Sequence, residues 1–192
     1  MPFPVIDNDE LAKLIHINAD GAMPGMRAAT LSALYPVSGA GDAPAAPPDQ
    51  TATEVAPALA DATGAPILLH PDDLPLWLKT HPEHTPDGDL TDGQELTVAG
   101  ITLTVLHTPG HAPGAVCLYA PELATVFTGD TLFQGGPGAT GRSFSSFPTI
   151  IDSIRDRLLT LPGDTKVRTG HGDPTTIGAE APGLDEWIKR GH

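Results

Sequence analysis

Three glycine-rich segments, each following a run of residues typical of a strand, constrain this fold most. They read "HTPGH" at 107–111, "FTGDTLF" at 127–133 and "TGHGDPTTIG" at 169–178. A helix would bring His107 and His111 onto one face, but Pro109 and Gly110 between them break helices. We therefore expect three loops that leave strands and gather at one rim of a sheet structure, where binding sites are usually built.

Each of the three loops carries one side chain that can bind a metal ion. His111 and His171 offer imidazole nitrogens, and Asp130 offers a carboxylate. Zinc and iron accept this mixture of ligands, and an aspartate can bridge two cations. The loops therefore predict a metal site whose ligands come from three different strand ends.

Charge and composition restrict the classes of partner. The 192-residue chain has a formal net charge of −14, which argues against nucleic acids and anionic membranes. Cys117 is its single cysteine, which excludes a disulfide framework, and no apolar run reaches membrane-spanning length. The N-terminus lacks a basic region followed by an apolar one. We expect one cytoplasmic domain, residues 1–192, that binds a small-molecule substrate; the sequence leaves its oligomeric state open.

The hydrophobic pattern predicts alternating strands and helices after an irregular stretch. Residues 21–50 are rich in Ala, Gly and Pro without periodicity, so we expect an irregular or disordered segment there. The predicted strands are 65–70, a hairpin over 94–108, 114–120, 124–130 and 165–172. The predicted helices are one opened by Asp7 or Asn8, then 53–64, 71–81 (helix or turn), 147–161 and 183–192.

The motifs "HTPGHAPGAVCL", "VFTGDTLF" and "GHGDPTTIG", in this order, resemble the metallo-β-lactamase fold superfamily, nearest its glyoxalase II and persulfide dioxygenase branch. The resemblance runs from about Thr53 to Gly178 and implies an α/β fold of the αββα sandwich type. It implies that His111 and His171 bind metal and that Asp130 binds or bridges the ions as the catalytic carboxylate. The implied cofactor is one or two Zn²⁺, or Fe²⁺.

The family reaction implied by this resemblance is the attack of a metal-bound hydroxide on a carbonyl group, usually that of a thioester. Arg142 lies where dioxygenase-like members have an arginine that meets the substrate carboxylate, so it is a candidate substrate-binding residue. It can equally be a solvated loop arginine. His107 is expected to be a structural residue that orients the site.

The sequence departs from the family pattern at its main metal motif. The family has His-x-His-x-Asp-His just before the helix that is predicted here near Thr53, but this chain reads "PPDQTATEVAP". No histidine occurs between His16 and His70. The fragment "HINADG", from His16 through Asp20, matches the motif only in part and about thirty residues too early. The N-terminal part of the sandwich is therefore expected to be incomplete, and only 21 residues follow His171, too few for the extra domain with which glyoxalase II holds glutathione.

Three functions remain open at this point. The first is a glyoxalase II-like metal-dependent hydrolase of a thioester-type small molecule, or a degenerate descendant of one. The second is a mononuclear iron persulfide dioxygenase, in which His111 and Asp130 supply two of three ligands and His16 would have to supply the third. The third is a pseudo-enzyme that acts as a binding module, which the missing motif favours.

Overall fold

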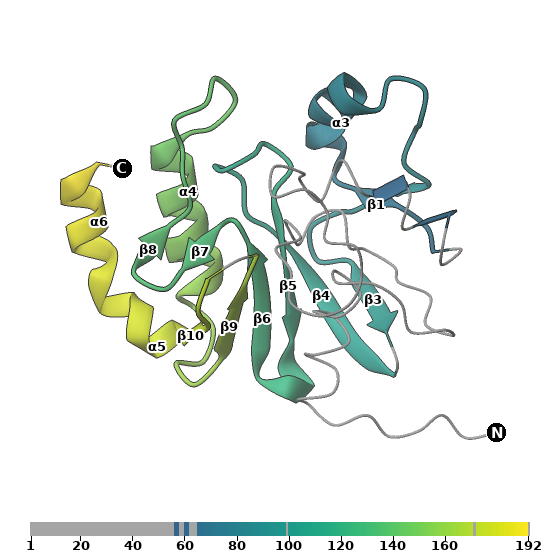
Figure 1. Ribbon diagram of the computed structural model, residues 1–192. Helices are drawn as coiled ribbons and strands as arrows, with labels where there is room; N and C mark the ends of the chain where they lie inside the picture. Colours follow the sequence, from purple (N-terminus) through teal and green to yellow (C-terminus); the bar gives the residue numbers. More distant parts are fainter. Residues whose placement is uncertain (1–55, 58–59, 62–64, 99, 171, 192) are drawn as a thin grey trace.

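The computed structural model describes residues 56–57, 60–61, 65–98, 100–170 and 172–191 of the chain (Figure 1). The irregular segment predicted at 21–50 and the N-terminal helix lie outside these residues. The helix predicted at 53–64 lies mostly outside them too, although residues 56–57 and 60–61 are helical. No helix in the described ranges is long and apolar enough to cross a membrane.

A six-stranded sheet organises the described part of the chain. Its strands run in the spatial order β10-β9-β6-β5-β4-β3. They are β3 (Glu95–Val98), β4 (Ile101–His107), β5 (Val116–Ala120), β6 (Thr125–Gly129), β9 (Lys166–Thr169) and β10 (Thr175–Thr176). All neighbours are antiparallel except β6 and β9, which are parallel. The predicted hairpin and the three further long strands are confirmed.

This topology decides where the three loops meet. Because β4 and β6 are both antiparallel to β5, they run parallel to each other, and β9 runs parallel to β6. The C-terminal ends of β4, β6 and β9 therefore lie at the same edge of the sheet. The loops that carry the predicted ligands begin at that edge.

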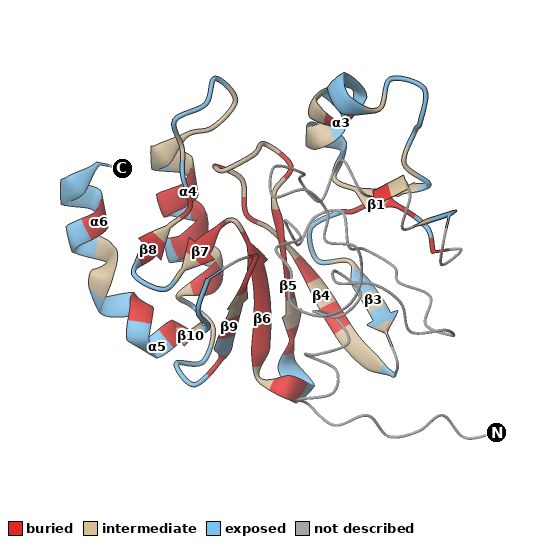
Figure 2. Ribbon diagram, viewed as in Figure 1, coloured by how far each residue is buried: buried red, intermediate tan, exposed pale blue. Residues whose placement is uncertain are grey.

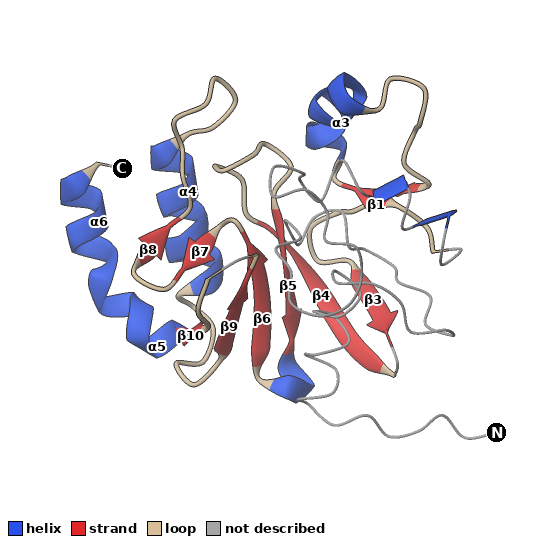
Figure 3. Ribbon diagram, viewed as in Figure 1, coloured by secondary structure: helices blue, strands red, loops and turns tan. Residues whose placement is uncertain are grey.

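A layer of helices covers one face of the sheet, next to β6 and β9 (Figure 3). It consists of α4 (Phe147–Ser153), a π-helical turn (Ile154–Leu158), α5 (Ile177–Glu180), a 3-10 turn (Ala181–Gly183) and α6 (Leu184–Arg190). Ser146 begins α4, because its side chain accepts a hydrogen bond from Thr149 N. The predicted helix 147–161 is thus present, but it widens into the π-helical turn in its second half.

The apolar side chains form separate clusters on the two faces of the sheet. The cluster under the helices contains Ile150, Ile154, Leu158 and Val167, all fully buried. The other cluster contains Leu90, Val105, Leu118 and Phe127. Figure 2 shows the buried residues concentrated in β5, β6 and α4. Burial of such side chains stabilises the fold by about 1.5–3 kcal/mol each before the entropy cost of ordering the chain is subtracted.

A small two-stranded unit and a hairpin complete the fold. The unit pairs β1 (Leu68–Leu69) with β2 (Gly88–Asp89), and between them lie a 3-10 turn η1 (Pro71–Asp73) and α3 (Leu74–Thr80). Trp77 anchors α3, since it is buried and its indole Nε1 donates to His84 O at 2.5 Å. β7 (Leu132–Phe133) and β8 (Gly136–Pro137) form the hairpin after β6. A 3-10 turn η2 (Pro121–Leu123) joins β5 to β6.

Candidate metal centre

The loop after β4 is held in place by the start and the body of α4. Gly110 has a φ of 137°, and a Cβ there would overlap the backbone of Ile150, so only glycine fits. Its carbonyl oxygen accepts from Ser146 N at 2.8 Å. Ser153 Oγ donates to the carbonyl oxygen of Pro109 at 2.7 Å. The residue after Gly110, His111, therefore starts from a fixed backbone position.

The end of β6 presents Asp130 toward the same loop. β6 is buried along its whole length, and Thr131 N donates to Thr128 O at 2.9 Å in the turn that follows it. Gly138 lies so close to the Asp130 carbonyl oxygen that a Cβ would overlap it. The segment after Gly138 can therefore pass directly beside Asp130.

His111 and Asp130 meet at this edge with their lone pairs facing each other. His111 Nδ1 lies 2.9 Å from the carbonyl oxygen of Ala139, which can only accept, so Nδ1 carries the proton. His111 Nε2 is then unprotonated in the neutral ring, and it lies 3.6 Å from Asp130 Oδ2. Two electron-rich atoms at this separation are suited to a shared cation. A carbonyl that fixes the tautomer of the imidazole is also the usual environment of a metal-binding histidine.

The third predicted ligand, His171, lies outside the described residues. The strand that leads to it is described: Gly170 N donates to Gly129 O at 2.9 Å. The residues that precede His171 and Asp130 are therefore hydrogen bonded to each other. His16 and Asp20, the partial match to the missing motif, also lie outside the described residues.

His107 makes a different set of contacts. Its Nε2 lies 2.9 Å from Pro113 O, and its backbone N–H donates to Asp92 Oδ1 at 2.9 Å. Its ring stacks on that of His70, with centroids 4.0 Å apart and planes at 13°. The contact with Pro113 joins the two ends of the loop that bears His111. The supporting role of His107 stays a prediction.

Arg142 lies in the exposed segment that passes the edge where His111 and Asp130 meet. Its backbone N–H donates to Ser145 Oγ at 2.9 Å, and its guanidinium carbon lies 6.0 Å from the centroid of the Phe144 ring. The side chain is exposed. Ala139, three residues earlier, accepts the hydrogen bond from His111, so the segment of Arg142 adjoins the candidate site.

Sequence reasoning missed the contribution of η1 to this edge. Asp73 Oδ1 accepts from Gly114 N at 2.6 Å, and desolvation by burial raises the pKa of the Asp73 carboxyl. His70 packs against His107. The run "HPDD" after a predicted strand was visible in the sequence, but nothing in it indicated which loop it would contact.

Cys117 is a core residue. It is fully buried in β5, and its Sγ lies 3.2 Å from Thr108 Oγ1. Desolvation raises the pKa of its thiol to about 11. The thiol is therefore neutral at physiological pH and takes no part in the site.

Comparison with known families identifies the superfamily of this chain. The family model of the metallo-beta-lactamase superfamily matches residues 55–171, which make up more than half of the chain. The protein belongs to the metallo-beta-lactamase superfamily, and the predicted fold class is thereby confirmed.

Individual relatives confirm the glyoxalase II and persulfide dioxygenase-like branch. The hydroxyacylglutathione hydrolase GloC of Haemophilus influenzae is 44% identical over 89 residues, which cover 46% of this chain and 42% of that protein. A solved structure of TTHA1623 in a di-iron-bound form is 37% identical, with a TM-score of 0.61, over 67% of this chain and 68% of the other. The solved structure of ETHE1 from Myxococcus xanthus is 25% identical, with a TM-score of 0.60, over 71% of this chain and 61% of the other. The chain spans less than half the length of GloC.

Proposed function

We propose that this protein is a glyoxalase II-like metal-dependent hydrolase that acts on a thioester-type small molecule. The observation that carries the proposal is the meeting of His111 and Asp130, with an unprotonated imidazole nitrogen 3.6 Å from a carboxylate oxygen. Membership of the metallo-beta-lactamase superfamily and the similarity to GloC support the reaction class.

The donor set fits a divalent ion of the zinc or iron type. An imidazole and a carboxylate suit both metals, and His171 would add a second imidazole from the end of β9. The chemistry that a bound ion supplies is Lewis-acid activation of water and of a carbonyl group. In the proposal, His111 and His171 anchor metal and Asp130 holds it from the end of β6.

The remaining tasks fall to the protein around these ligands. In the neutral ring, Ala139 O fixes the proton of His111 on Nδ1 and leaves the lone pair of Nε2 for metal. Arg142 is proposed to bind an anionic group of the substrate, since a guanidinium pairs well with a carboxylate. Its exposed loop would let a substrate approach from solvent.

The test measures metal content and thioester hydrolysis on the same preparations. We would purify the full chain and its His111→Ala and Asp130→Asn variants, with His84→Ala as a control in an exposed loop far from the site in sequence. Each is loaded with Zn²⁺ or with Fe²⁺ under anaerobic conditions, and hydrolysis of an acyl-glutathione thioester is followed by the loss of thioester absorbance.

The expected result is that the wild type and His84→Ala bind metal and hydrolyse the thioester, while both site variants lose metal affinity by more than about tenfold. Equal metal content in the His111→Ala and His84→Ala variants would contradict the assignment of His111. A wild-type chain that binds no metal at micromolar concentrations would favour the non-catalytic binding module.

A second candidate function is an iron-dependent dioxygenase that acts on a thiol persulfide. The similarity to the TTHA1623 structure in its di-iron-bound form favours iron at this edge. Oxygen consumption that depends on a persulfide and on Fe²⁺, with no thioester turnover under any metal, would select this function over hydrolysis.

A further inference from the structure

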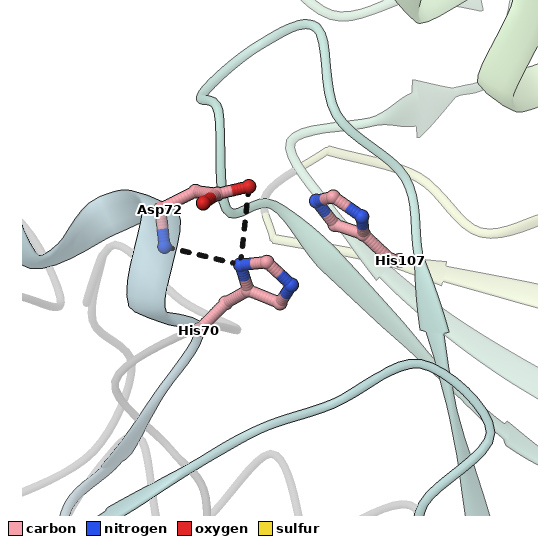
Figure 4. A group of neighbouring side chains, drawn as sticks. All are labelled: His70, Asp72 and His107. Atoms are coloured by element: carbon pink, nitrogen blue, oxygen red, sulfur yellow. Dashed lines mark hydrogen bonds and ion pairs between the residues drawn. The ribbon is translucent and has the colours of Figure 1, made fainter.

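A second group of side chains that could hold a metal ion lies where η1 meets the end of β4. It contains His70, Asp72 and His107, and one ligand atom from each lies within 4.8 Å of the others. Figure 4 shows that the three side chains come from two parts of the chain: His70 and Asp72 from the start of η1, and His107 from the end of β4. His107 is also the first residue of the "HTPGH" segment that leads to His111, whereas His70 and Asp72 come from a separate part of the chain.

His70 and Asp72 face each other as His111 and Asp130 do. Asp72 N donates to His70 Nδ1 at 3.3 Å, so this nitrogen is the unprotonated one in the neutral ring. An ion bound at Nδ1 would replace this long hydrogen bond, because the nitrogen has a single lone pair. The same nitrogen lies 3.8 Å from Asp72 Oδ2. Tetrahedral ligands of a zinc-type ion are about 3.4 Å apart, given bonds of roughly 2.1 Å, so a small movement of the exposed Asp72 side chain would close the pair around an ion.

His107 adds a second imidazole with a defined tautomer. Pro113 O can only accept, so the proton of the neutral His107 ring is on Nε2 and Nδ1 retains its lone pair. A backbone carbonyl that accepts from the other ring nitrogen is the usual partner of a metal-binding histidine. The donor set is then two imidazoles and one carboxylate.

The surroundings of His70 carry negative charge. Asp72, Asp73 and Asp89 all lie close enough to His70 to act on it electrostatically. The three nearby carboxylates add a negative potential that attracts a divalent ion.

We infer that His70, Asp72 and His107 form a second cation site, distinct from the His111 centre, that takes a borderline divalent ion such as Zn²⁺ with water completing its coordination. The two rings are now stacked with planes at 13°. Each lone pair lies in the plane of its ring, so binding through both imidazoles requires the rings to tilt out of this stack. An ion there would link η1 to the end of β4 and so fasten the base of the His111 loop.

The test removes the proposed catalytic centre first, so that the two sites are measured separately. The His111→Ala chain is titrated with Zn²⁺ alone by calorimetry, and Asp72→Asn, His107→Gln and His84→Gln are each added to this background. Asp72→Asn changes an exposed side chain and leaves its backbone N–H in place, so it should fold normally; circular dichroism checks each variant.

We expect the His111→Ala chain to bind one Zn²⁺ whose affinity falls roughly tenfold or more with Asp72→Asn and with His107→Gln, and is unchanged with His84→Gln. Proton NMR should show shifts of the His70 and His107 ring signals on binding. The inference is overturned if His111→Ala binds no Zn²⁺, or if the added variants bind as tightly as that background. In either case loss of metal on going from wild type to His111→Ala still supports the catalytic centre.

Discussion

Replacement of Asp73 by alanine tests whether η1 holds the loop that carries His111. Asp73 Oδ1 accepts the backbone N–H of Gly114, which is buried, at 2.6 Å. The acceptor is lost in Asp73→Ala, and the Gly114 N–H is left without its partner. A hydrogen bond to a charged group contributes about 1.5–3 kcal/mol, and an unsatisfied buried donor costs about 1–3 kcal/mol. We therefore expect the free energy of unfolding to fall by about 2 kcal/mol.

Asp73→Asn is the matched control, because its side-chain oxygen can still accept from Gly114. Urea unfolding, followed by circular dichroism, should give a lower midpoint for Asp73→Ala and a near wild-type midpoint for Asp73→Asn at pH 7. In thermal unfolding the alanine variant should lose about 4–8 °C, given about 2–4 °C for each kcal/mol in a chain of this size.

The pH dependence of stability provides a second readout for the same residue. Burial raises the pKa of the Asp73 carboxyl, so the folded protein holds this proton more tightly than the unfolded chain does. The contribution of Asp73 to stability is then largest at low pH and decreases as the pH rises from about 4 through the raised pKa. Asp73→Asn should remove this decrease. The reasoning is refuted if Asp73→Ala unfolds with the wild-type midpoint, or if Asp73→Asn is destabilised as much as Asp73→Ala.

Three further predictions follow from buried contacts and titrating groups. Gly110→Ala places a Cβ against Ile150 at a φ of 137°, so it should lower both the urea midpoint and the metal affinity. Wild-type values for Gly110→Ala in both assays would contradict the loop geometry. Ile150→Ala should cost about 2–5 kcal/mol in urea unfolding, because Ile150 is fully buried. The pKa of His70 is lowered in the folded protein, so the unfolded chain binds a proton at a higher pH than the folded protein does. The free energy of unfolding should therefore decrease as the pH falls below about 6.5, and His70→Gln should reduce this decrease in unfolding measured as a function of pH.

The sequence by itself determined the local structure around the candidate centre. Pro109 and Gly110 excluded a helix through "HTPGH", and the apolar alternation before it predicted the strand that became β4. The glycine beside each ligand indicated a loop at a strand end. These inferences were available because turn chemistry and side-chain periodicity act over a few neighbouring residues.

Only the tertiary structure decided which distant groups meet. The parallel direction of β4, β6 and β9 follows from the sheet order, and it alone brings His111 to Asp130. The bond between Asp73 and Gly114 joins residues 41 positions apart, and no local pattern encodes it. The stack of His70 on His107 is of the same kind. Such contacts arise when separate elements bury their apolar faces together, so the sequence names the candidate groups while packing chooses their partners.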